Sequence, residues 1–260
     1  WLTANGESGL FPAARVDPED IAIYADESRK TPLMTWHNLR QQNQKPTGRA
    51  NLCLADFIAP KETAVADWIG AFAVAVGGFE SRLARLEAEH DDYGAIMAKV
   101  LADRLAEAFA ERLHELVRTE LWGYAEGESL DNAALIREQY QGIRPAPGYP
   151  ACPEHTEKRT ILALLEADRR AGITLTESCA MLPTASVSGM YFWHPGAAYF
   201  GVGRIGNTTL GGALVGGGGE RLVVGGHGGG GAGGAAPPET SPCAARRGAA
   251  ANRSDHRREV

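Results

Sequence analysis

The sequence predicts an α+β fold, a single domain with a largely antiparallel, twisted β-sheet flanked by long helices. Three observations lead to this fold class: short apolar runs of strand length, one long stretch with helical periodicity, and an abrupt change of composition near residue 204. The predicted domain therefore covers residues 1–204. Residues 205–260 form a separate low-complexity tail rich in Gly and Ala.

Strands are predicted where a short apolar run is bounded by turn or charge signals. Residues 21–24 and 50–55 fit this description near the start of the chain. Residues 190–193 and 199–202 fit it near the end, separated by a turn at His194. The run 68–76 is apolar throughout, which suits either a buried strand or a helix.

The clearest element is a long amphipathic helix over residues 93–120. Its apolar positions recur at near-helical spacing: Met97, Leu101, Leu105, Phe109, Leu113 and Val117. Asp91 and Asp92 suit its start, because acidic side chains favour the positive end of the helix dipole. A second helix is predicted over residues 157–170, ended by Gly172.

Composition and charge narrow the class of protein. The net charge is −6, and residues 1–204 carry 20 Lys and Arg against 28 Asp and Glu. This acidic balance argues against nucleic acid or an anionic membrane as the main partner. The four cysteines are scattered, which fits a reducing compartment and predicts neither a zinc site nor disulfides. With no long apolar run and no signal peptide, we expect a cytoplasmic protein cut from a longer chain.

The tail is predicted to be disordered. Residues 205–260 hold sixteen of the 32 glycines and no aromatic residue, so they cannot bury a core. A gene read in the wrong frame would give such a segment, and a natural flexible tail is the alternative. The G-x-G-x-x-G pattern at 201–206 is not followed by a helix pattern, and 216–219 lacks a Lys-Ser/Thr ending, so neither predicts a nucleotide site.

The most informative segment is residues 142–155, where four prolines stiffen a loop that would otherwise be mobile. Arg144 offers a planar donor fork for a carboxylate, Gly148 permits close backbone approach, and Tyr149 adds a ring with a polar tip. The alternative is a rigid connection in which Arg144 pairs with a surface carboxylate. Cys152 lies between prolines and lacks a second ligand cluster, so no metal site is predicted.

Residues 142–155 resemble, over their whole length, the S-adenosylmethionine-binding reactivation domain of cobalamin-dependent methionine synthase. The R-x-x-x-G-Y signature of that family matches Arg144 to Tyr149. Further segments are similar in the same order: 1–6, 39–42, 53–61, 69–74, 90–93, 101–110, 175–178 and 185–189. Similarity stops near Arg204, where the family continues with a charged helix.

The resemblance implies a binding site without a catalytic side chain. Arg144 would hold the ligand carboxylate, the backbone at Ala146 and Gly148 and the ring of Tyr149 would border the ligand, and Tyr199 and Phe200 would hold its adenosine. The blander reading of Phe200 is a strand residue in the core. An aspartate that contacts the ligand's amino group in the family lies upstream of Trp1, so this chain lacks it.

The resemblance also implies cofactors and partners. S-adenosylmethionine would donate a methyl group to cobalamin carried by a neighbouring domain of the same polypeptide, rescuing cofactor oxidised to cob(II)alamin. A flavodoxin or flavoprotein reductase would supply the electron, and zinc would belong only to the parent enzyme's homocysteine module. Two alternatives stay open: a plain binding or regulatory module, and a stand-alone reactivation subunit that acts in trans.

Overall fold

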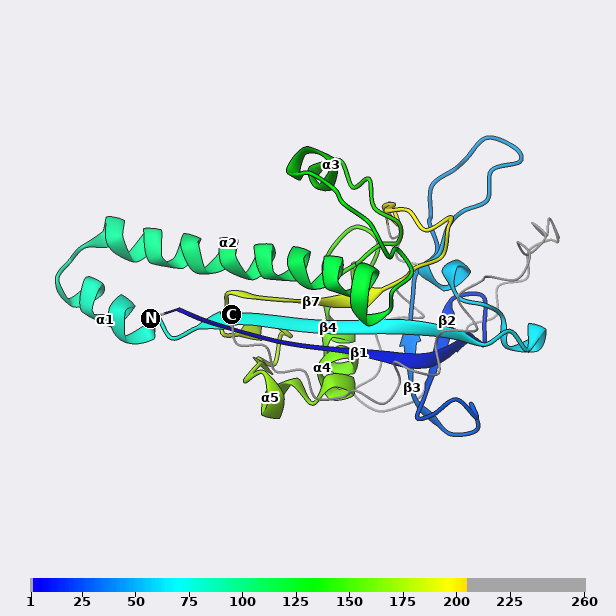
Figure 1. The fold of residues 1–260 in the computed structure, drawn as a ribbon, viewed down its shortest axis with the longest axis horizontal. Helices are drawn as coiled ribbons and strands as arrows, with labels where there is room; N and C mark the ends of the chain where they lie inside the picture. Colours follow the sequence, from blue (N-terminus) through cyan, green and yellow to red (C-terminus); the bar gives the residue numbers. More distant parts are fainter. Residues whose placement is uncertain (1, 205–260) are drawn as a thin grey trace.

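A computed structural model describes residues 2–204, and its centre is a five-stranded sheet in the order β3-β2-β1-β4-β7 (Figure 1). The strands are β1 (Thr3–Arg15), β2 (Asp20–Tyr24), β3 (Pro32–His37), β4 (Asp67–Gly77) and β7 (Ser186–Tyr191). A separate pair joins β5 (Thr174–Leu175) to β6 (Met181–Leu182). Every strand pairing is antiparallel, which confirms the predicted fold class.

The helices lie on both faces of this sheet. They are α1 (Glu80–Ala88), α2 (Asp92–Leu116), α3 (Asn132–Ile136), α4 (Lys158–Leu165) and α5 (Ala167–Arg170). Short 3₁₀ turns cover η1 (Leu54–Phe57), η2 (Lys61–Thr63) and η4 (His155–Glu157), and a π-helical turn, η3 (Val117–Leu121), extends α2. Figure 1 shows α2 along one side of the long strands and α4 with α5 on the other.

Strand β4 is the centre of both hydrophobic layers. Ile69 and Ala73 pack in the cluster that contains α4, whereas Phe72 and Val74 pack in the cluster that contains α2. Because neighbouring residues of a strand point to opposite faces, a strand covered on both sides is apolar at every position. This double burial explains why the run 68–76 did not distinguish strand from helix.

The long predicted helix is confirmed, with Asp91 as its N-cap accepting a hydrogen bond from the Gly94 backbone N–H at 2.8 Å. Its buried face differs from the spacing of the large apolar residues, because α2 packs through alanines, first against α1 and then, from Ala102 on, against the sheet. The buried alanines are Ala95, Ala98, Ala102, Ala106 and Ala110. The exposed residues on this half include Ile96, Met97, Val100, Leu101 and Leu105. Small side chains let the helix axis approach the strands closely.

Two predicted strands are wrong. Residues 50–55 form a loop and the start of η1, and their apolar character reflects burial, since Cys53 and Leu54 are 0% exposed. Residues 199–202 belong to no strand. Their backbone instead bridges two loops: the Val202 N–H donates to the Pro150 carbonyl at 2.9 Å, and the Gln42 N–H donates to the Val202 carbonyl at 2.7 Å.

The second predicted helix is divided into α4 and α5. Glu166 separates them with a left-handed backbone, φ 48°, which ends one helix and begins the next. The strand predicted at 190–193 is β7 at its first two positions, and Phe192 continues it only as an isolated bridge to Ile143. The turn at His194 is confirmed by the Ala197 N–H donating to its carbonyl.

Within residues 2–204, no helix has the length and apolar character needed to cross a membrane. The predicted tail at 205–260 lies outside the described residues, as does the last part of the G-x-G-x-x-G pattern.

Candidate functional site

The loop 142–155 is fixed to the free edge of β7 by backbone hydrogen bonds. Ile143 and Phe192 exchange two bonds of 2.8 and 3.0 Å, and the Met190 N–H donates to the Pro145 carbonyl at 3.0 Å. The carbonyl of Pro145 comes so close to Gly189 that a Cβ atom there would lie 2.6 Å from it. The loop therefore continues the sheet, and a rigid strand sets its position.

The tip of this loop closes on itself around Gly148. The Gly148 N–H donates to the Cys152 carbonyl at 2.8 Å, and the Cys152 N–H donates to the backbone carbonyl of Tyr149 at 2.9 Å. Gly148 has φ +97°, and an added Cβ would meet the His155 ring at 2.3 Å, so only glycine fits. This tight turn leaves the Tyr149 side chain 57% exposed, and Ala146 lies half-buried before it.

Arg144 points from this loop to the C-terminal half of α2. Its Nη2 donates to Glu111 Oε2 at 2.6 Å, and its Nη1 donates to the Tyr140 hydroxyl at 3.1 Å. The two charged side chains are 20% and 29% exposed, so the pair is shielded from water on most sides. The pairing with a carboxylate anticipated in the alternative reading is thus present, and the Nε–H makes no hydrogen bond with any described residue.

His114 lies beneath Arg144 and is fully buried. Its ring stacks on Tyr191 at 5.2 Å, and its Nδ1 lies 3.4 Å from Arg144 Nη1. Burial, together with the positive charges of Arg118 and Arg144, holds the pKa of His114 well below its usual range. Because a guanidinium can only donate, a neutral His114 must accept at Nδ1 and carry its proton on Nε2.

The structure brings Tyr199 to Arg144 but takes Phe200 elsewhere. The Tyr199 hydroxyl accepts a hydrogen bond of 3.0 Å from the Arg144 backbone N–H, and its side chain is partly exposed. The Phe200 ring packs against Phe57 at a centroid distance of 6.4 Å, next to the main core cluster. Of the predicted pair, therefore, Tyr199 contacts Arg144, whereas Phe200 packs against the core from a segment that belongs to no strand.

Glu111, His114 and Tyr140 were not predicted as site residues. Glu111 and His114 come from a helix more than 25 positions before the loop, and a helical pattern shows only that Glu111 is polar. Tyr140 lies four residues before Arg144 and makes no recognisable motif with it. Only the packing of α2 against β7 brings these three side chains together.

The cysteine in this loop shows no sign of reactivity or metal binding. Burial raises the pKa of the Cys152 thiol to about 12, so it stays protonated. His155 Nδ1 instead lies 2.9 Å from Lys158 Nζ. Across residues 2–204, no three His, Cys, Asp or Glu side chains gather as they would around a metal ion.

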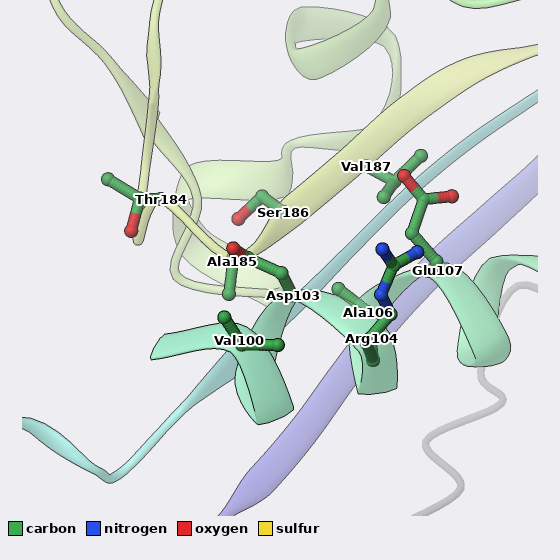
Figure 2. Close-up of a pocket in the computed structure, with 9 residues that line it drawn as sticks. All are labelled: Val100, Asp103, Arg104, Ala106, Glu107, Thr184, Ala185, Ser186 and Val187. Atoms are coloured by element: carbon green, nitrogen blue, oxygen red, sulfur yellow. The ribbon is translucent and has the colours of Figure 1, made fainter. Parts of the chain in front are cut away.

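A shallow pocket lies between α2 and the start of β7 (Figure 2). It is lined by Val100, Asp103, Arg104, Ala106, Glu107, Thr184, Ala185, Ser186 and Val187. Arg144 does not line it. Glu107, which lines the pocket, precedes Glu111 by about one helical turn on α2.

Together, the loop fixed to β7, its paired arginine and two partly exposed tyrosines form one polar cluster on an α+β domain. The chain belongs to the family described as vitamin B12 dependent methionine synthase, activation domain, whose sequence profile matches residues 1–211. It is also similar to a crystal structure of the MetH reactivation domain bound to AdoHcy, with 61% identity and a TM-score of 0.75. That match covers 78% of this chain and 62% of the other, so this chain spans less than two thirds of that structure.

Proposed function

We propose that this chain binds S-adenosylmethionine and presents its methyl group for the reactivation of a B12 cofactor. The observation that carries this proposal is the AdoHcy bound to the similar MetH reactivation domain. AdoHcy is what remains of S-adenosylmethionine after the methyl group has left, and both carry the same carboxylate, amino group and adenosine. A site for one therefore suits the other.

The residues of the loop fit such a ligand. Arg144 keeps its Nε–H free of partners among the described residues, so it can pair with the ligand carboxylate while Glu111 holds Nη2. The exposed ring of Tyr149 can face a sulfonium, since an aromatic face attracts a cation. In this proposal the backbone at Ala146 and Gly148 borders the ligand and Tyr199 meets its adenosine, while Phe200 supports that region through its packing against Phe57.

The contribution of this chain is placement. When bound, S-adenosylmethionine supplies the methyl group to cobalamin on a neighbouring domain of the same polypeptide, and a flavodoxin or flavoprotein reductase supplies the electron. Positioning of the reacting groups accounts for the rate gain expected from the protein, and no side chain need move a proton. His114, the histidine nearest to Arg144, is neutral and buried, which agrees with a role in packing.

The test is titration calorimetry of AdoHcy and decarboxylated AdoHcy. Arg144→Ala should weaken AdoHcy by about 2–5 kcal/mol, the range for removing one partner of a buried charged pair. Arg144→Lys should recover only part, because an ammonium cannot replace a bidentate fork. The control is Arg112→Ala, on an exposed arginine of α2 that pairs with Glu115.

The decarboxylated compound separates a ligand clamp from a structural arginine. It should bind the parent chain weakly and lose little more in Arg144→Ala. Equal losses for both compounds, together with a lower melting temperature, would mean that Arg144 only stabilises the loop and that the site is assigned wrongly.

A further inference from the structure

Tyr140 lies at the centre of the Arg144 cluster, between two arginines. The guanidinium of Arg118 lies over its ring, 4.4 Å from the centroid, and the ring of His114 meets it edge-on at 5.0 Å. Arg118 is itself 0% exposed and held by Glu128 through hydrogen bonds of 2.6 to 3.0 Å. The Tyr140 ring therefore rests on a buried, hydrogen-bonded support, which fixes where its hydroxyl points.

That hydroxyl is a second side-chain contact of Arg144, beside Glu111. It accepts from Arg144 Nη1 at 3.1 Å, and the Tyr199 hydroxyl accepts from the Arg144 backbone N–H at 3.0 Å. Burial, the nearby Tyr199 and a hydrogen bond with it raise the pKa of Tyr140 well above its usual range. The phenol is thus protonated while its oxygen accepts from Arg144. Two tyrosines hold Arg144, Tyr140 at its side chain and Tyr199 at its backbone.

We propose that Tyr140 is a positioning residue that fixes the Arg144 guanidinium relative to Tyr199, so that the carboxylate end and the adenosine end of the ligand site are set together. This inference rests on the proposed function, in which Arg144 meets the ligand carboxylate. Tyr140 acts through Arg144 and need not touch the ligand.

Tyr140 matters because few hydrogen bonds fix the orientation of the Arg144 guanidinium. Glu111 holds only Nη2, and His114 lies at a long 3.4 Å from Nη1. Without the Tyr140 oxygen, the guanidinium keeps its charge but can turn about the Glu111 contact. A bidentate pair needs two aligned N–H groups, so a turned fork binds a carboxylate less well.

Tyr140→Phe isolates this effect, because the ring keeps its contacts with Arg118 and His114 and only the oxygen is lost. Calorimetry on the full chain should show AdoHcy weakened about threefold to tenfold, the scale of one hydrogen bond. Decarboxylated AdoHcy should change by less than about twofold, because it lacks the group that Arg144 binds. The matched control is Tyr93→Phe, on a tyrosine of α2 that is 75% exposed, which should bind both compounds like the parent chain.

A second comparison tests whether the effect passes through Arg144. In the Arg144→Ala background, Tyr140→Phe should cause no further loss of AdoHcy affinity, because the group it positions is gone. Unchanged AdoHcy binding in Tyr140→Phe, or equal weakening of both compounds, would overturn the inference. So would a further loss in the Arg144→Ala background.

These outcomes are distinct from failure of the proposed function. If Arg144→Ala itself weakens both compounds equally, the ligand clamp is misassigned and the role of Tyr140 falls with it. If Arg144→Ala is selective for AdoHcy and Tyr140→Phe is not, only the positioning role is wrong.

Discussion

The two halves of α2 meet the sheet in different ways. The first half buries alanines and leaves larger residues such as Met97 and Leu101 exposed. The second half and the π turn that follows bury His114 and Arg118 at 0% exposure, each with specific partners. The N-terminal part of α2 thus makes apolar contacts through small side chains. Its C-terminal part contributes the buried polar side chains that surround Arg144.

The π turn contributes to this difference. The Trp122 N–H donates to the Val117 carbonyl at 2.9 Å, five residues back, so the helix widens there. Val117 and Arg118, although adjacent in sequence, are both buried. Burying an arginine is costly unless its positive charge is compensated. Here Arg118 forms an ion pair with Glu128 and a cation–π contact with the ring of Tyr140.

The largest expected effect follows from breaking that pair. Arg118→Met leaves Glu128 partly buried without its partner, and should lower the free energy of unfolding by about 3–5 kcal/mol. Urea denaturation measures this change. The control is Arg112→Met, whose pair with Glu115 is exposed and should matter by less than about 0.5 kcal/mol. Similar losses for both would show that burial of the Arg118–Glu128 pair does not make it more important than an exposed pair.

A smaller effect is expected in the middle of α2, where alanines pack against the sheet. Ala106 is 1% exposed against the sheet, so Ala106→Leu should overpack the contact and cost about 1–3 kcal/mol of unfolding free energy. The neighbouring Leu105 is 44% exposed, and Leu105→Ala should cost much less. The same denaturation experiment compares them. A greater loss from Leu105→Ala would mean that the exposed side of α2 is packed in solution.

The sequence predicted the existence of α2 and of the sheet better than it predicted their contacts. Periodicity identified the helix, but the small size of Ala102 and Ala106 decided which face is buried. Residues 199–202 looked like a strand because they form a short apolar run, yet the backbone hydrogen bonds of Val202 go to two loops distant in sequence. Arg144 was identified by its loop and by resemblance, whereas Glu111, His114 and Tyr140 depend on tertiary packing that no local pattern encodes.

The smallest effect concerns pH and returns to the polar end of α2. In the folded chain the pKa of His114 lies well below its ordinary 6.5. As the pH falls below 6.5, the unfolded chain therefore binds a proton at this histidine that the folded chain does not bind. The contribution of this group is therefore complete above about pH 6.5 and is lost as the pH falls, with a slope of up to about 1.4 kcal/mol per pH unit.

Glu157 changes the unfolding free energy with pH in the opposite direction to His114. The contribution of His114 must therefore be measured as a difference between two variants. Burial raises its pKa from 4.5 to about 7, so the folded chain holds a proton that the unfolded chain releases, and stability from this group is lost as the pH rises towards 7. The two slopes oppose each other between pH 4.5 and 6.5, so the parent chain alone shows a flattened curve.

His114→Gln removes the slope that comes from His114 and leaves the slope that comes from Glu157. The unfolding free energy of the parent minus that of His114→Gln, measured by urea denaturation from pH 7.5 to 5, should therefore fall as the pH is lowered. The control for the loss of a histidine as such is His90→Gln, on an exposed histidine before α2. A difference that stays level for His114→Gln would mean that His114 ionises in the folded chain and that the cluster under Arg144 is open to water.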